Sequence, residues 1–395
     1  MILEEVGRVY ILRQKNKMNY IHFNNAGSSL PEISTTKIIN KYFELESKIG
    51  GYEAEEKEKS RIEKFYVNTS KLINCEPREI SFFSNATLSW NLFFKSINFN
   101  SLDEIIIAEN EYTSNFISIL KRKHEFNKLK IIKIDQNGLI SLEDLKNKIN
   151  NRTKLVSINH IASQCGTVMP VQEIGNILKK KNPDIIYFLD CSQTVGHIEI
   201  DVKKIKCDVL TASGRKFLRG PRGTAFLYIK SKIISNLKPV FQDMSNTQIE
   251  TNHNLKLIKT KNFLEMYEHS PGLKLGLANA VEKITRFGIT KINKKVIELS
   301  KYLRKRMLQN KNFMFVETEK NLSGINTIVS FKIDNKKIFK FLKKNKINIF
   351  ISNHKHSFLY FKKLKIKSVL RISFHHFNKK KEIDILIKTL NSIND

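Results

Sequence analysis

The sequence predicts an α/β protein whose large domain is a mostly parallel sheet covered by helices, followed by a smaller C-terminal α/β domain. Short runs rich in Ile, Val, Leu and Phe alternate with helical segments over the first two-thirds of the chain. Near-continuous apolar runs are typical of strands with helices on both faces. The 395 residues are enough for one large domain and a smaller one.

The first part of the chain contains repeated strand–helix units, which favour an α/β architecture. One intervening helix is expected over 141–149, where Ser141 and Asp144 form an N-terminal capping pattern. A second helix is expected over 171–180. The expected strands are 79–83, 104–108, 130–134, 154–158, 185–189 and 208–212.

A polar, aperiodic segment at 231–262 marks the end of this part. We expect an N-terminal segment (1–30) that contributes to the functional site, a large domain (31–262), and a helical connection with a small domain (263–395). The elements expected in the last part are a helical stretch over 273–306, strands at 326–331, 347–351 and 369–374, and helices over 336–345 and from 380.

Composition restricts the partners and the cellular location of the protein. The net charge is +31, but the lysines are spread through the chain rather than gathered in one stripe, so a nucleic-acid partner is not expected. No apolar run is long enough to span a bilayer, and the N-terminus lacks a secretory pattern. The four cysteines form no CxxC pair, which argues against a zinc site and fits a reducing cytoplasm.

Polar motifs follow several strands at the edge where open α/β sheets bind ligands. The segment 84–87 precedes a helix, so its N–H groups could bind an anion, or Ser84 or Asn85 could simply cap the helix. Asp190 ends an apolar strand, where a carboxylate needs a cation or hydrogen-bond donors. A pyridinium nitrogen is one such cation, and a helix-capping role is the alternative.

Two further motifs carry cationic side chains. Ser213, Arg215 and Lys216 lie together after a buried strand, beside glycines that allow a ligand to approach the backbone. The spacing of a Walker phosphate loop is absent. Arg371 lies in an otherwise apolar strand, so it needs an anionic partner, either a ligand carboxylate or an internal acid.

Together and in this order, these motifs resemble the class V aminotransferase family, the cysteine-desulfurase-like branch of the fold-type I pyridoxal-phosphate enzymes. The resemblance runs from Asn24-Asn-Ala-Gly27 to the segment 371–378, and its most specific piece is Asp190-x-x-Gln193 followed by Ser213-Gly-Arg-Lys216. The most similar subgroup is the isopenicillin-N-epimerase-like and ergothioneine C–S-lyase-like set, which 50–54, 214–224 and 375–378 resemble.

The resemblance implies that Lys216 binds pyridoxal 5'-phosphate covalently, that Asp190 keeps the ring nitrogen protonated and that Gln193 contacts the phenolic oxygen. Tyr112 stands where desulfurases have a ring-stacking histidine, and Arg371 would bind the α-carboxylate of an amino-acid substrate. No metal is implied. The other implied contacts are Asn85, Ala86, Thr87, Ser163, Ser213 and Arg215 for the cofactor and Asn25 for the substrate. Ser163 departs from the asparagine that the family usually has there.

The reaction is narrowed by the cysteines. Desulfurases carry a mobile catalytic cysteine in the C-terminal third, but no cysteine follows Cys207, and the corresponding segment 351–357 has none. We therefore expect a cytoplasmic, homodimeric pyridoxal-phosphate enzyme, a C–S lyase that eliminates sulfur from a cysteine-derived or cysteine-sulfoxide substrate. Transamination and epimerisation are the alternatives within the family. A basic nucleic-acid-binding or scaffold protein is the alternative outside enzymes, and the presence of both Asp190 and Lys216 disfavours it.

Overall fold

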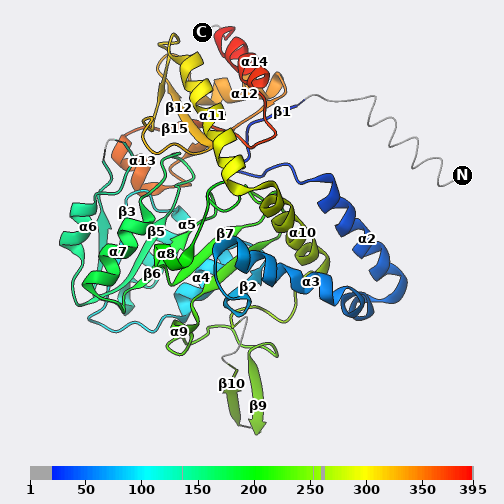
Figure 1. Cartoon of the computed structure of the whole chain (residues 1–395). Helices are drawn as coiled ribbons and strands as arrows, with labels where there is room; N and C mark the ends of the chain where they lie inside the picture. Colours follow the sequence, from blue (N-terminus) through cyan, green and yellow to red (C-terminus); the bar gives the residue numbers. More distant parts are fainter. Residues whose placement is uncertain (1–19, 136, 252, 259–262, 394–395) are drawn as a thin grey trace, which may run out of the picture.

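The computed structural model describes residues 20–393 except 136, 252 and 259–262, so residues 1–19 of the expected N-terminal segment lie outside it. A large helix-covered sheet forms the body of the molecule, and a smaller sheet with its own helices lies beside it (Figure 1). The expected α/β fold is confirmed. None of the described helices combines the length and the apolar character needed to cross a membrane.

The large sheet has seven strands in the order β2-β8-β7-β6-β5-β3-β4. β8 runs antiparallel to both of its neighbours, while the remaining pairs are parallel. β8 was not among the expected strands. The strands are β2 (Ile80–Phe83), β3 (Glu104–Ala108), β4 (Lys128–Ile132), β5 (Thr153–Asn159), β6 (Ile186–Asp190), β7 (Val209–Ser213) and β8 (Ala225–Ile229).

Side chains alternate between two apolar clusters on opposite faces of this sheet. Ile106 and Val156 belong to one cluster, and their neighbours Ile105 and Leu155 belong to the other. This arrangement explains why the strands are apolar throughout. The helices of this part are α2 (Ile33–Ile49), α3 (Gly51–Ile73), α4 (Ala86–Ser96), α5 (Thr113–Lys121), α6 (Leu142–Lys148), α7 (Val171–Lys181), α8 (Val202–Ile205) and α9 (Ser231–Ile234).

The small domain is built on an antiparallel sheet of order β11-β12-β15-β14. The N-terminal segment joins this domain, because β1 (Ile21–His22) pairs with β13 (Ile347–Asn348) and Asn24 bridges Ser373. The other elements are β11 (Phe313–Phe315), β12 (Ile325–Ser330), β14 (Phe350–Asn353), β15 (Ser368–Ser373), α12 (Asn335–Lys344), α13 (Phe358–Leu364) and α14 (Lys380–Asn391).

Two expectations about the connecting region need correction. The helical stretch over 273–306 is two helices, α10 (Pro271–Phe287) and α11 (Ile289–Met307), separated by Gly288 at φ +99°. Glycine adopts this conformation without the penalty of a side chain. The segment 231–262, expected to be aperiodic, contains α9 and a hairpin, β9 (Thr247–Thr251) and β10 (Asn254–Leu257), that projects from the body (Figure 1).

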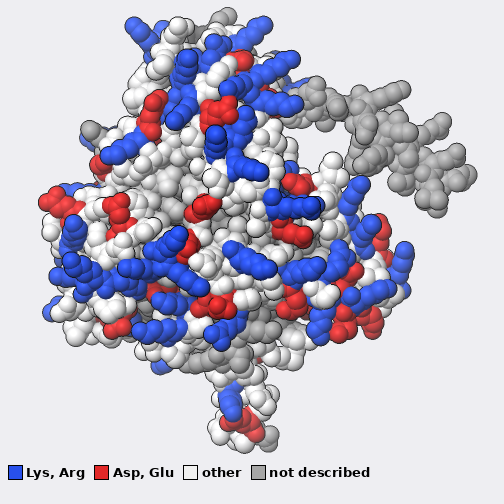
Figure 2. Space-filling view, viewed as in Figure 1, with Lys and Arg blue, Asp and Glu red and all other residues white. Residues whose placement is uncertain are grey.

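Charge is distributed over the surface much as the sequence indicates. On the face shown in Figure 2, basic side chains cover both parts of the molecule with acidic side chains between them. This face therefore presents no single continuous basic stripe.

Candidate functional site

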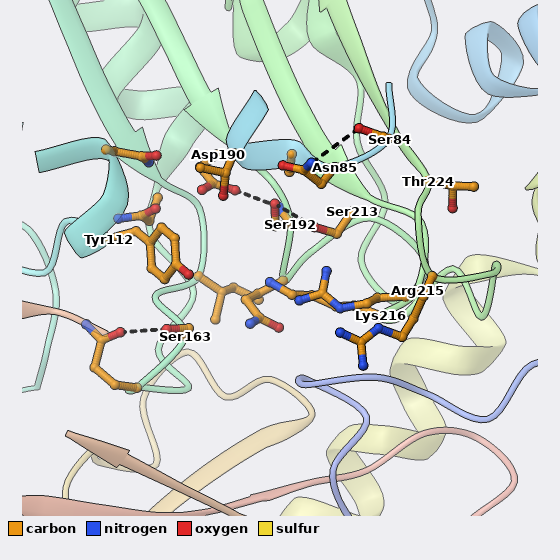
Figure 3. A pocket seen from close by; sticks show the side chains of 18 of the residues that line it. Ser84, Asn85, Tyr112, Ser163, Asp190, Ser192, Ser213, Arg215, Lys216 and Thr224 are labelled. Carbon is orange, nitrogen blue, oxygen red and sulfur yellow. Dashed lines mark hydrogen bonds between the residues drawn. The ribbon is translucent and has the colours of Figure 1, made fainter. Parts of the chain in front are cut away.

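A polar cavity of about 410 Å³ lies at the carboxyl ends of the parallel strands (Figure 3). Its volume is in the range of small-molecule sites. All ten residues expected to contact the cofactor line it: Asn85, Ala86, Thr87, Tyr112, Ser163, Asp190, Gln193, Ser213, Arg215 and Lys216. The structure thus gathers residues from well-separated segments of the chain in one place. Their individual roles stay predictions.

One end of the cavity is the N-terminus of α4. The Asn85 side chain accepts a hydrogen bond from the Leu88 N–H at 2.8 Å, so the capping alternative is realised. Ala86 and Thr87, in the first turn, also line the cavity, together with the cationic Arg215. A helix N-terminus beside a guanidinium is a favourable place for a phosphate. Capping and anion binding are therefore compatible here.

The Lys216 side chain is partly buried, and its amine forms no hydrogen bond with the described residues, whereas its carbonyl accepts from the Arg219 N–H at 2.9 Å. Burial lowers its pKa to about 7, and the positive charge of Arg215 contributes to this lowering, while Asp190 opposes it. An amine with this pKa is largely unprotonated slightly above neutral pH, as a nucleophile or base requires.

Across the cavity from Arg215, Figure 3 shows the ring of Tyr112.

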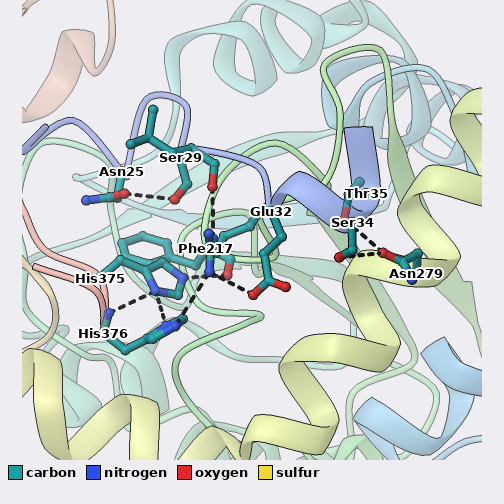
Figure 4. Close-up of polar contacts among 11 residues, drawn as sticks. Asn25, Ser29, Glu32, Ser34, Thr35, Phe217, Asn279, His375 and His376 are labelled. Atoms are coloured by element: carbon teal, nitrogen blue, oxygen red, sulfur yellow. Dashed lines mark hydrogen bonds and ion pairs between the residues drawn. The ribbon is translucent and has the colours of Figure 1, made fainter. Parts of the chain in front are cut away.

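The residues after Lys216 are held firmly in place. The Phe217 ring stacks on His197 with the centroids 3.9 Å apart, and the Phe217 carbonyl lies 3.0 Å from His375 Nε2. Arg219 donates to the Leu30 carbonyl of the N-terminal segment and to Glu32, both at 2.9 Å. Figure 4 shows Phe217, His375 and Glu32 in this region. Large-domain, small-domain and N-terminal residues therefore all fix the position of the lysine-bearing segment.

Asp190 and Gln193 present unsatisfied polar groups to the cavity. Asp190 Oδ1 accepts from the Ser192 N–H at 2.9 Å, and Asp190 forms no ion pair among the described residues. Gln193 Nε2 donates to the Ala26 carbonyl at 3.1 Å, but its Oε1 is buried without a partner, as are both amide atoms of Asn110. A cavity with such orphaned groups fits a polar ligand that supplies a cation and hydrogen-bonding atoms.

Arg371 is buried on β15, beside the cavity but not among its lining residues, and it has no acidic partner among the described residues, so the internal salt bridge left open by the sequence is absent. It donates to the Ser163 carbonyl at 2.8 Å and lies over the Phe350 ring at 4.6 Å. Burial lowers its pKa to about 9, and Arg215 contributes. A buried guanidinium that lacks an anion suits a substrate carboxylate.

Asn25 does not line the cavity. Its amide donates to the Ser373 carbonyl at 2.7 Å and to Asn378 Oδ1 at 3.2 Å, and its Oδ1 accepts from Ser29 at 2.8 Å. These bonds fasten the N-terminal segment to the small domain. A substrate contact by Asn25 stays a prediction.

Several site residues were missed in the sequence. Asn110, which lines the cavity, and Glu111, which lies behind it, come two and three residues after the expected strand 104–108, so their position near a strand end was the available signal. Asn159 directly follows the expected strand 154–158, so the same signal was available for it, whereas Asn115 carried no signal of its own. The additional lining residues are Ser84, Asn110, Asn115, Asn159, Ile161, Gln164, Ser192, Arg222, Gly223 and Thr224.

Comparison with known proteins places the chain in a family. The family model described as aminotransferase class-V matches residues 21–386. A probable cysteine desulfurase of Pyrococcus abyssi is 27% identical over 384 residues, which are 94% of each chain. A putative cysteine desulfurase of Plasmodium berghei is 36% identical over 233 residues, covering 55% of this chain and 44% of the relative.

Solved structures share the fold. An apo cysteine desulfurase of Thermococcus onnurineus superposes with a TM-score of 0.87 at 23% identity, over 94% of each chain. A complex of the cystine C–S lyase C-DES superposes with a TM-score of 0.85 at 16% identity, over 96% of this chain and 99% of that one. The epimerase-like subgroup stays a prediction. The chain belongs to the class V aminotransferase family of pyridoxal-phosphate enzymes, as the sequence motifs predicted.

Proposed function

We propose that this enzyme is a C–S lyase that eliminates the β-sulfur substituent of a cysteine-derived or cysteine-sulfoxide amino acid. The observation that carries the proposal is that no cysteine is among the described residues that line the cavity. Three of the four cysteines, Cys165, Cys191 and Cys207, are buried away from the lining, and Cys75 is partly buried. The relatives named as desulfurases thus support the family and the sulfur-containing substrate class, but a persulfide relay lacks its acceptor here.

The segment that stands where desulfurases carry their mobile cysteine is tied down in this protein. Thr113 N–H donates to the His356 carbonyl at 3.1 Å, and the Phe358 N–H donates to Thr113 Oγ1 at 3.1 Å. Ser357 Oγ donates to the Glu111 carbonyl at 2.9 Å. A segment fixed by these bonds to the cavity wall suits a role in enclosing the substrate rather than carrying sulfur.

The chain's own residues have distinct tasks in this proposal. Pyridoxal phosphate, when bound, supplies an electron sink for the charge left at the α-carbon of the substrate. Arg371 binds the α-carboxylate, and Asp190 holds the proton on the ring nitrogen. Lys216 Nζ, whose lowered pKa of about 7 leaves it largely unprotonated slightly above neutral pH, would take the α-proton. The Cβ–S bond then breaks and its electron pair leaves with sulfur, so that hydrolysis yields pyruvate and ammonia.

A cofactor spectrum and a product assay test the proposal. The purified wild-type protein should be yellow, and its visible band should vanish with borohydride. Lys216→Ala should lose the reducible band, whereas Lys301→Ala, a change at an exposed lysine of α11, should keep it. A reducible band that persists in Lys216→Ala would remove Lys216 from its role.

The reaction type is decided by the products. Pyruvate and ammonia formed from a cysteine derivative without a keto-acid acceptor would support elimination. A requirement for a keto acid would show transamination instead, and exchange of the α-hydrogen for deuterium without net loss of substrate would show epimerisation. The homodimer, the cytoplasmic location and the lack of nucleic-acid binding stay predictions.

A further inference from the structure

Glu111 is a buried acid directly behind the cavity wall, between β3 and α5. Its side chain is 2% exposed. Glu111 Oε1 accepts from the Tyr112 N–H at 2.7 Å, Asn115 Nδ2 at 3.0 Å and Asn159 Nδ2 at 3.1 Å. Ser157 Oγ donates to Oε2 at 3.3 Å. Three of the four partners, Tyr112, Asn115 and Asn159, line the cavity.

The contacts of Glu111 are unusual for a buried acid because no Lys or Arg among the described residues pairs with it. Its partners are neutral donors, which stabilise the carboxylate form without cancelling its charge. A buried charge of this kind acts on its surroundings more strongly than an exposed one, because the protein interior screens it less than water does.

The charged neighbour of Glu111 is Asp190. Asn159, which donates to Glu111, is the register partner of Asp190 in the β5–β6 ladder. Burial raises the pKa of Glu111 to about 7, and the negative charge of Asp190 contributes to this rise. The titratable groups on the adjoining segments are Tyr112 itself and His356, whose loop binds the Glu111 carbonyl through Ser357.

We propose that Glu111 is a positioning residue of the cofactor site, which fixes the wall formed by Tyr112, Asn115 and Asn159 and adds a second negative charge behind Asp190. The inference rests on the proposed binding of pyridoxal phosphate in this cavity. The hydrogen bond from the Tyr112 N–H to Glu111 holds the Tyr112 backbone at the N-terminus of α5. This backbone position determines how the Tyr112 ring is oriented toward the cavity. Above about pH 7, where Glu111 is ionised, its charge reinforces Asp190 in holding a proton on the ring nitrogen.

Two substitutions separate the hydrogen bonds from the charge. In Glu111→Gln the amide oxygen can keep the three N–H donors, and the new NH₂ group can donate to Ser157 Oγ, so chiefly the charge is lost. Glu111→Ala removes both. Glu109→Gln is a matched control, because Glu109 lies two residues away, outside the cavity lining, and instead accepts from the Ile134 N–H and Lys363.

Two quantities are measured. The first is the affinity of the apo protein for pyridoxal phosphate. The second is the midpoint of the pH titration of the visible band, that is, the pH at which half of the bound cofactor has lost its proton. Loss of a negative charge near a protonated chromophore lowers that midpoint, and we expect a fall of about 0.5 pH unit or more in Glu111→Gln. In Glu111→Ala the orientation of the wall is lost as well, and the apparent Kd for the cofactor should rise about fivefold or more. Glu109→Gln should match the wild type in both measurements.

Each outcome supports or overturns the inference. An unchanged midpoint in Glu111→Gln, or an equal shift in Glu109→Gln, overturns it. If Glu111→Ala does not fold, the midpoint measured for Glu111→Gln is sufficient by itself. A wild-type protein that forms no reducible cofactor band would overturn the proposed function and this inference together, whereas a normal wild-type band with unaltered variants overturns this inference alone.

Discussion

Replacing Lys216 with methionine should stabilise the cofactor-free protein, because the native fold holds an amine in a place that disfavours its charge. Burial lowers the Lys216 pKa from 10.5 to about 7. In the unfolded chain the amine keeps its ordinary pKa and stays protonated up to about pH 10. Folding between these two values therefore releases a proton, and the release costs free energy.

The size of this cost follows from the two pKa values. At about 1.4 kcal/mol per unit, the native protein is destabilised by about 3 kcal/mol at pH 8 and by about 1 kcal/mol at pH 9.5. Because the pKa of Lys216 is lower in the folded protein than in the unfolded chain, the destabilisation is complete below about pH 7. It disappears above about pH 10.5. Methionine has a similar unbranched shape and carries no charge, so Lys216→Met should regain this free energy.

Urea unfolding of the apo proteins at several pH values measures the difference. Lys216→Met should be more stable than the wild type by a few kcal/mol near pH 8, and the gain should shrink steadily as the pH rises. Lys301→Met, on the exposed face of α11, serves as the control and should show no such trend. A Lys216→Met protein that is no more stable than the wild type, or whose gain does not depend on pH, would refute the reasoning.

Three other changes test parts of the site. Asn85→Asp should keep the N-terminal cap of α4, so the free energy of unfolding measured in urea should stay within about 0.5 kcal/mol of the wild type. The added negative charge should weaken cofactor binding about tenfold in a cofactor titration. An unchanged affinity would argue against a phosphate at the N-terminus of α4. Arg371→Ala should raise the apparent KM about tenfold or more without altering the resting spectrum, and an unchanged KM would remove Arg371 from carboxylate binding. Gly196→Ala should lower the free energy of unfolding by more than about 2 kcal/mol, because Gly196 has φ +105° and an added Cβ would lie 2.4 Å from the Phe217 carbonyl carbon. Gly51→Ala, where an added Cβ has nothing within 4 Å, is its thermal-unfolding control, and equal melting temperatures would contradict the prediction.

The sequence by itself indicated six of the seven strands of the large sheet, because a strand buried on both faces must be apolar at every position. It also singled out Asp190 and Lys216 as candidate site residues, because their places after such strands, taken with the neighbouring motifs, resemble the class V aminotransferase pattern. The strand β8 was not predicted, although Ala225–Ile229 form an apolar run like those of the other strands. Its antiparallel direction depends on the path of the chain. The hairpin β9–β10 was not predicted, because its strands are largely exposed and lack apolar periodicity.

Only the tertiary structure decided which charges remain unpaired. Arg371 could have met an internal acid, and the sequence left that alternative open, but the fold surrounds it with the Ser163 carbonyl and the Phe350 ring. The place of Glu111 just after a strand did not reveal its contacts, because its hydrogen-bond partners Asn115, Ser157 and Asn159 come from α5 and β5. Local patterns record burial and periodicity along the chain, whereas the pairing of buried polar groups depends on which distant segments the fold brings together.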